Sequence, residues 1–304
     1  MTLHALREGD LVAVLAPAGP ADPALLPAVE ALYARHGLRV RLYPSCRAGF
    51  GAGSYLAGDD AARRADLHAA LADDEVAALH GLRGGYGCMR LLDGIDSGQV
   101  RRAAKLLIGY SDITALHALW CHAGVPSLHA PMPASDLVKP GRGADEAALF
   151  SLLRTGLRAG EVLAPALDAQ GPRAGGAAEG RLVGGNLSLV AALLGTPWAW
   201  PAAGAILFLE DINEELYRVD RLLTQLRLAG VLDAVAGFVL GSFTESTSPQ
   251  VLLAQMLGRL GKPVLGGWPS GHGTPNRPLP LGLRVRIDAA AGTLEVREDF
   301  LPAK

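Results

Sequence analysis

The feature that most constrains the fold is the alternation of apolar strands and helices in the first 130 residues. Residues 10–20 are an apolar run that ends in a Pro/Gly loop, which is typical of a buried strand, and residues 24–36 follow with helical spacing. Gly37 can end that helix, and residues 38–43 are predicted as the next strand. This strand–helix–strand order predicts a parallel α/β sheet, in which ligand sites lie at the carboxyl ends of the strands.

The alternation continues into a loop that is rich in glycine. Residues 55–71 are predicted as a helix, residues 76–80 as a strand, and the loop of residues 82–87 follows that strand. The dinucleotide fingerprint G-x-G-x-x-G would need a third glycine where the chain has Arg90, so a phosphate-binding loop is not favoured. Glycine here would equally let a backbone N–H group approach a reacting carbonyl.

Ser111 lies on a predicted turn between a strand and a helix. Residues 105–108 are a short apolar run, Gly109 stands at the join, and residues 113–120 have helical spacing. Such a turn exposes the hydroxyl at the sheet edge and directs backbone N–H groups and the positive end of the helix dipole at a bound group. Serine before a helix is also a common N-cap, and this stretch alone favours that simpler role.

A second domain is predicted after a stretch without clear periodicity. Between residues 137 and 180 glycine and proline interrupt the pattern, and one helix is expected at residues 146–153. We therefore predict an N-terminal α/β domain over residues 1–160 and a C-terminal α/β domain over residues 161–304. Strands of the second domain are predicted at residues 181–186, 205–211, 235–241 and 263–265, and as a possible hairpin at residues 283–296.

The composition argues against several classes of function. The chain has 304 residues and a formal net charge of −2, which gives no electrostatic basis for binding nucleic acid or an anionic membrane. The first ten residues lack an apolar signal core, and no uncharged apolar run approaches the length of a membrane span, about 18 residues. The three cysteines have no C-x-x-C spacing and are expected to be reduced thiols of a cytoplasmic protein.

Neither a metal site nor a cofactor is expected. His117 and His122 are five residues apart, which misses the i,i+4 spacing of a metal-binding pair on a helix. The sequence also contains no H-E-x-x-H motif and no cysteine cluster.

Two further residues could act together with Ser111. Glu210 ends the most apolar strand of the second half, and His272 is flanked by glycines in a loop. Taken singly, such an acid is most often solvated and such a histidine most often lies on the surface. Together they are the parts of a Ser–His–acid triad, in the chain order of the α/β-hydrolases. Those enzymes need G-x-S-x-G, and Ile113 stands at the second glycine position, so an ordinary α/β-hydrolase is not favoured.

At this point the sequence resembles a known family, the LD-carboxypeptidases of serine peptidase family S66. The arginine–glycine loop and the Gly-Tyr-Ser-Asp turn together are quite specific to it. The resemblance extends over most of the chain and is carried by residues 12–19, 55–58, 83–87, 109–112, 184–187, 209–211, 217–221 and 271–272.

The resemblance implies both a fold and a set of site residues. The implied fold is an N-terminal flavodoxin-like parallel-sheet domain followed by a C-terminal α/β domain of the barrel-like, swivelling type. Ser111 would be the nucleophile, His272 the general base and Glu210 its orienting acid. Backbone N–H groups of Gly85 and Asp112 would form the oxyanion hole, in which one donor typically contributes about 10²–10³-fold to turnover.

The resemblance also implies a reaction. It is hydrolysis of the bond between the L-centre of a diamino acid and a terminal D-alanine, in murein tetrapeptides that are recycled in the cytoplasm. Family members are often dimers, so a homodimer is expected. Two alternatives stay open: hydrolysis of peptidyl-nucleotide antibiotics for self-immunity, and a non-catalytic sugar- or nucleotide-binding module, against which the intact Ser, Glu and His argue.

The order of these residues along the chain predicts how the site is assembled. Ser111 precedes the proposed domain junction, whereas Glu210 and His272 follow it. We therefore expect a groove between the domains, with Gly85 and Asp112 on the Ser111 side. The Glu210–His272 pair should be tight, and the Ser111–His272 contact can be looser in the absence of substrate.

Overall fold

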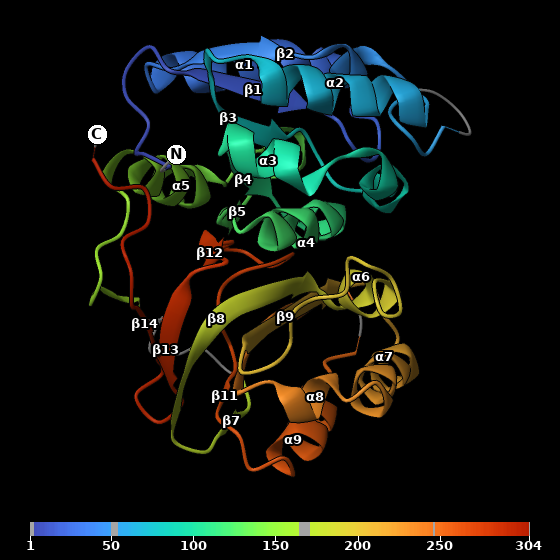
Figure 1. Ribbon diagram of the computed structural model, residues 1–304, viewed down its shortest axis with the longest axis vertical. Coiled ribbons are helices and arrows are strands. Elements are labelled where there is room, and N and C mark those ends of the chain that lie inside the picture. Colours follow the sequence, from blue (N-terminus) through green and yellow to red (C-terminus); the bar gives the residue numbers. More distant parts are fainter. Residues whose placement is uncertain (1–2, 50–53, 164–170, 246, 304) are drawn as a thin grey trace.

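The structure is a computed structural model that describes residues 3–49, 54–163, 171–245 and 247–303. It contains two sheets, one above the other in Figure 1, each with its own helices. The stretch predicted as the domain junction includes residues 164–170, which lie outside the described residues.

The first sheet is parallel except at one edge, in the order β12-β5-β4-β3-β1-β2. All five residues of β1 are buried, as expected of a strand covered by helices on both faces. The five strands that the first part of the chain supplies are β1 (Leu11–Leu15), β2 (Arg39–Leu42), β3 (Val76–Gly81), β4 (Leu106–Gly109) and β5 (Ser127–His129).

The α-helices that accompany this sheet in the described part of the chain are α1 (Leu26–Arg35), α2 (Asp60–Ala72), α3 (Ser97–Ala103), α4 (Thr114–Ala123) and α5 (Gly143–Thr155). Helix α2 begins later than the predicted residue 55, because the carboxylate of Asp59 accepts a hydrogen bond from the Ala62 N–H group and caps the helix there. The segment after the glycine loop is a 3₁₀ helix, η3 (Cys88–Gly94).

The second sheet is mixed and curled, in the order β6-β14-β13-β8-β9-β10-β11-β7. Strands β8 to β11 are parallel to one another, and β13 and β14 form the predicted antiparallel hairpin. Its strands are β6 (Val162–Leu163), β7 (Arg173–Ala174), β8 (Ala177–Asn186), β9 (Ile206–Ile212), β10 (Gly237–Thr244), β11 (Val264–Leu265), β13 (Arg284–Asp288) and β14 (Thr293–Val296). Its helices are α6 (Leu187–Ala192), α7 (Leu216–Leu228), α8 (Val231–Ala234) and α9 (Gln250–Gly258).

One strand from the second half of the chain joins the first sheet. Strand β12 (Leu279–Leu281) pairs antiparallel with β5, and Leu279 lies opposite His129. On the face between the sheets, the Asn186 N–H group donates to Thr114 Oγ1 at 3.0 Å, which joins β8 to α4. The two halves of the chain are therefore tied together beside the turn that carries Ser111.

The two sheets share one contiguous set of buried apolar side chains. None of the helices in the described part of the chain combines the length and the apolar character needed to cross a membrane.

Candidate active site

Ser111 lies on a sharp turn between β4 and α4. It opens the short 3₁₀ helix η4 (Ser111–Ile113), and its φ of 62° is in the left-handed region that serine rarely adopts. Such a conformation costs an L-residue about 1–2 kcal/mol. A strained serine at a strand end is typical of a residue whose hydroxyl must be presented to a ligand.

The glycine loop packs directly against this turn. A Cβ on Gly84 would lie 2.8 Å from Ser111 Cβ, 2.9 Å from Ser111 Oγ and 3.6 Å from the Asp112 nitrogen. The buried Asp112 carboxylate accepts a hydrogen bond of 2.8 Å from the Cys88 N–H group at the exit of the loop. Burial raises the pKa of Asp112. Its side chain thus fastens the glycine loop to the turn that follows β4.

The acid and the histidine form a tight pair in the second half of the chain. Glu210 is fully buried on β9, and its Oε2 atom accepts from His272 Nδ1 at 2.7 Å and from the His272 N–H group at 3.2 Å. A Cβ at Gly271 would lie only 2.5 Å from Glu210 Oε2, so the glycine before the histidine has a steric reason.

The loop that carries His272 is held on both sides of the histidine. The Gly271 N–H group donates to Asn276 Oδ1 at 3.0 Å, and the Gly273 N–H group donates to Ser242 Oγ at 2.8 Å. Asn276 is itself held by Asp145 of α5, whose Oδ1 accepts from the Asn276 N–H group at 2.8 Å. The histidine loop is therefore anchored to both halves of the molecule.

The structure brings the three predicted side chains into one chain of contacts. His272 Nε2 lies 3.1 Å from Ser111 Oγ, so the serine hydroxyl can donate to the imidazole while the imidazole donates to Glu210. The Ser111–His272 contact is already within hydrogen-bond reach. A looser contact was allowed for in the absence of substrate, but none is seen; β12 and the Asn186–Thr114 hydrogen bond tie the two halves together.

The charges of the pair support each other. Burial alone would raise the pKa of Glu210, but His272 and, at a longer distance, His129 outweigh it and lower the pKa of this carboxyl. Burial alone would lower the pKa of His272, but the Glu210 carboxylate outweighs it and raises the pKa of the imidazole. Glu210 is thus ionised at neutral pH, and His272 is a stronger base than an ordinary histidine.

Two residues that sequence reasoning did not single out also adjoin the site. The Tyr110 ring packs against His272 with ring centroids 4.8 Å apart, and its hydroxyl donates to Asp136 at 3.0 Å. His129, at the end of β5, lies 3.8 Å from Glu210. Tyr110 belongs to the Gly-Tyr-Ser-Asp turn, which could have indicated it, whereas His129 had only the signal of a histidine at a strand end.

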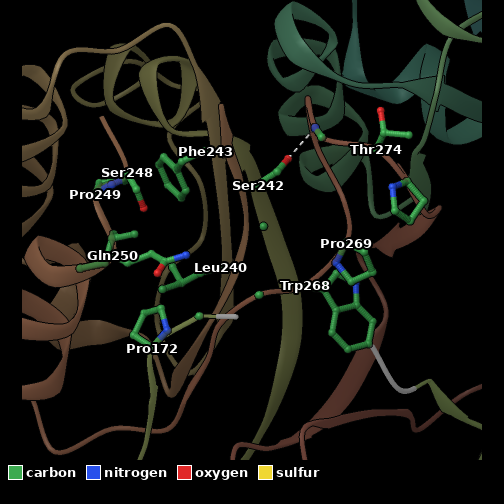
Figure 2. Close-up of a pocket in the computed structure, with 16 residues that line it drawn as sticks. Pro172, Leu240, Ser242, Phe243, Ser248, Pro249, Gln250, Trp268, Pro269 and Thr274 are labelled. Atoms are coloured by element: carbon green, nitrogen blue, oxygen red, sulfur yellow. Dashed lines mark hydrogen bonds between the residues drawn. The ribbon is translucent and has the colours of Figure 1, made fainter. Parts of the chain in front are cut away.

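A cavity of about 240 Å³ lies beside the histidine loop (Figure 2). Ser242 points from β10 toward the loop, and the dashed line marks its hydrogen bond with the Gly273 N–H group. Residues 273–275 form part of the wall. The cavity therefore borders the loop that carries His272, and Ser111, Glu210 and His272 do not line it.

Within the described residues, no cluster of three or more histidine, cysteine or carboxylate side chains could hold a metal ion. The three cysteines form no disulfide, and Cys46 and Cys88 are buried.

Comparison with known proteins places these features in a family. Residues 12–130 match the LD-carboxypeptidase N-terminal domain, and residues 179–287 match the LD-carboxypeptidase C-terminal domain. The chain is 38% identical over 302 residues to a probable murein peptide carboxypeptidase of Bacillus subtilis, with 95% of this chain and 92% of that protein covered. It is 34% identical over 287 residues to the murein tetrapeptide carboxypeptidase of Pseudomonas aeruginosa, with 89% and 91% covered.

Solved structures agree with this assignment. A muramoyltetrapeptide carboxypeptidase from Oxalobacter formigenes superposes with a TM-score of 0.82 at 30% identity, covering 96% of this chain and 99% of that one. MccF in complex with glutamyl sulfamoyl guanosine has a TM-score of 0.86 at 21% identity, with 99% of both chains covered, which shows a common fold alone. The sequence, the fold and these relatives together show that the chain belongs to the LD-carboxypeptidase family S66 and is a carboxypeptidase.

Proposed function

We propose that the protein is a serine LD-carboxypeptidase that removes the terminal D-alanine from murein tetrapeptides. The observation that carries the proposal is the unbroken line of contacts from Ser111 Oγ through His272 to Glu210. The scissile bond joins the L-centre of the diamino acid to that D-alanine. Relatives that cover most of the chain are named as carboxypeptidases of murein peptides, which supports this substrate class.

Each side chain then has a defined step in the reaction. Ser111 Oγ attacks the carbonyl carbon while His272 Nε2 takes its proton, and Glu210 stabilises the imidazolium that forms. His272 next gives this proton to the nitrogen of D-alanine as the C–N bond breaks. Water attacks the acyl-enzyme and gives a proton to His272, which passes it to Ser111 Oγ as the ester C–O bond breaks and the tripeptide leaves.

The negative oxygen of the tetrahedral intermediate needs donors that are already in place. We assign this role to the backbone N–H groups of Gly85 and Asp112. The close packing of Gly84 on Ser111 supports the assignment, because it places the glycine loop and the serine turn against the same reacting atom.

A second candidate is the cleavage of peptidyl-nucleotide antibiotics for self-immunity. It is favoured by the similarity to the microcin C7 self-immunity protein MccF of Escherichia coli, which is 32% identical over 133 residues, or 41% of this chain. The relatives named as murein peptide carboxypeptidases match over about twice that share of the chain, so we place this activity second.

We also infer a place of action and an assembly from the family. The enzyme would work on recycled tetrapeptides in the cytoplasm, as a homodimer. Cell fractionation and light scattering of the purified protein test these two inferences separately from the activity.

The reaction is tested by incubating the enzyme with murein tetrapeptide and following the loss of one alanine by mass spectrometry. A tetrapeptide that ends in L-alanine is the control for the LD bond and should remain intact. A fluorophosphonate reagent should label wild-type enzyme at Ser111 and leave the Ser111→Ala variant unlabelled. Intact tetrapeptide after prolonged incubation, or labelling that survives the substitution, would overturn the proposal.

A further inference from the structure

The two oxygens of the Glu210 carboxylate have very different surroundings. Oε2 accepts two hydrogen bonds from His272, as described above. Oε1 is buried and has no hydrogen-bond partner among the described residues. A buried carboxylate oxygen without a donor is costly, because water cannot reach it to replace the missing bond. The second oxygen therefore needs an explanation.

His129 faces this oxygen from the other half of the molecule. Its Nε2 atom lies 3.8 Å from Glu210 Oε1, and both side chains are fully buried. Neither ring nitrogen of His129 has a hydrogen-bond partner in the described part of the chain. An imidazole always carries at least one N–H group. His129 can therefore offer a donor without a partner beside Glu210 Oε1, an acceptor without a partner.

The other fully buried histidines of the first domain provide the comparison. His80 uses both ring nitrogens, with Tyr33 Oη at 2.8 Å and the Pro131 carbonyl at 3.0 Å. His117 also uses both, with Ser127 Oγ at 2.8 Å and the Gly109 carbonyl at 2.9 Å. These two buried histidines are thus fully bonded, and His129 differs from them because the only polar group near its ring nitrogens in the described residues is the acid.

Packing leaves His129 little freedom to turn elsewhere. The Phe208 ring stands edge-on to it with centroids 4.9 Å apart, and the Tyr110 ring lies 5.7 Å away. Its backbone is in register with Leu279 of β12, the strand that follows the His272 loop. The same strand pairing that brings the His272 segment to the first sheet therefore fixes His129 beside the acid.

We propose that His129 is a positioning residue for the triad acid, whose Nε2–H group donates to Glu210 Oε1. The inference rests on the proposed function, in which Glu210 orients His272. A movement of less than about 1 Å converts the present 3.8 Å contact into a hydrogen bond of ordinary length. Glu210 is then held between two histidines, one from each half of the chain, and its carboxylate plane cannot rotate away from His272.

The test compares kinetic constants of two His129 variants with a matched control. His129→Leu removes the donor and should lower kcat by about 10–100-fold. The analogy is the loss of activity when a hydrogen bond that orients a metal-binding side chain is removed. KM should change little, because the lost contact does not touch substrate. His129→Gln keeps an N–H donor and should recover most of this loss.

The control is His80→Leu, which removes a fully bonded buried histidine of the same domain whose ring nitrogens bond Tyr33 and Pro131 and not the acid. It should lower the melting temperature without the selective loss of kcat. Equal losses of kcat in His80→Leu and His129→Leu, or no recovery in His129→Gln, would reduce His129 to a packing role and overturn the inference.

A measurement on the wild-type enzyme does not depend on how the variants fold. The ¹⁵N shifts of the His129 ring should show that Nε2 carries a proton. Protonation at Nδ1 alone would overturn the inference, since Nε2 could then not donate to Glu210.

Ser111→Ala distinguishes failure of the His129 role from failure of the proposed function. If it abolishes turnover while the His129 variants equal wild type, only the role of His129 fails. If it retains turnover, the proposed function itself fails.

Discussion

The two parts of the proposed triad are held in place by different physical means. The serine turn is fixed by backbone geometry: a left-handed φ at Ser111 and a glycine loop packed against it. The acid–histidine pair is fixed by charged side-chain hydrogen bonds in a buried setting. Catalysis should therefore be sensitive to atoms added around the Ser111 turn and to loss of charge in the Glu210–His272 pair.

The largest effect is expected from removing the nucleophile itself. Ser111→Ala deletes one oxygen, and it should lower kcat by at least about 10⁴-fold. The fold should be unaffected, because the small, half-buried hydroxyl contributes little to packing. Steady-state kinetics and thermal unfolding measure the two quantities, and a large drop in melting temperature would contradict a purely chemical role.

Loss of charge on the acid side should be nearly as damaging. Glu210→Gln keeps the shape of the side chain but removes the charge that raises the pKa of His272, so kcat should fall by about 10³–10⁴-fold. Glu146→Gln is the matched control, because Glu146 of α5 also accepts from a histidine, His36, at 2.7 Å, but its side-chain partners in the described residues are Arg35 and His36 and not the triad. Its kcat should equal that of wild type.

An added methyl group on the serine side should have an intermediate effect. A Cβ at Gly84 would overlap Ser111, so Gly84→Ala should displace the nucleophile and lower kcat on the order of 10²-fold. Gly258→Ala, at the end of α9, is the control, because a Cβ there meets no atom within 4 Å. If the two alanine variants are equally active, backbone packing does not control the position of Ser111.

The smallest effect is a displacement of the pH profile. His272 must be neutral to accept the serine proton, so kcat/KM should rise with pH through a midpoint above the ordinary histidine value of 6.5. The same raised pKa stabilises the folded state below that ordinary value, and this contribution is lost as pH rises through the raised pKa. A midpoint below 6.5 would mean that burial outweighs Glu210.

Much of the fold could be predicted because its signals are local. The apolar runs and helical spacing identified the parallel sheet, and the hairpin of β13 and β14 was expected from alternation. Element boundaries were less accurate, as with α2, because the capping by Asp59 competes with the wider helical pattern.

The sequence by itself determined which residues can do chemistry and which backbone shapes they adopt. The strand–turn–helix pattern placed Ser111 on a turn, and the glycines around His272 marked a loop. These are short-range properties, set by side-chain periodicity and by the steric freedom of glycine within a few residues.

Only the tertiary structure decided which of these residues meet. Glu210 and His272 are 62 residues apart in the chain, and Ser111 and His272 are 161 apart. The Ser111–His272 contact joins the two halves of the chain, which β12 ties together by pairing with β5, where Leu279 lies opposite His129. A local hydrophobic pattern fixes which face of a strand is buried, but the choice between distant partner segments follows from packing and hydrogen bonding over the whole molecule.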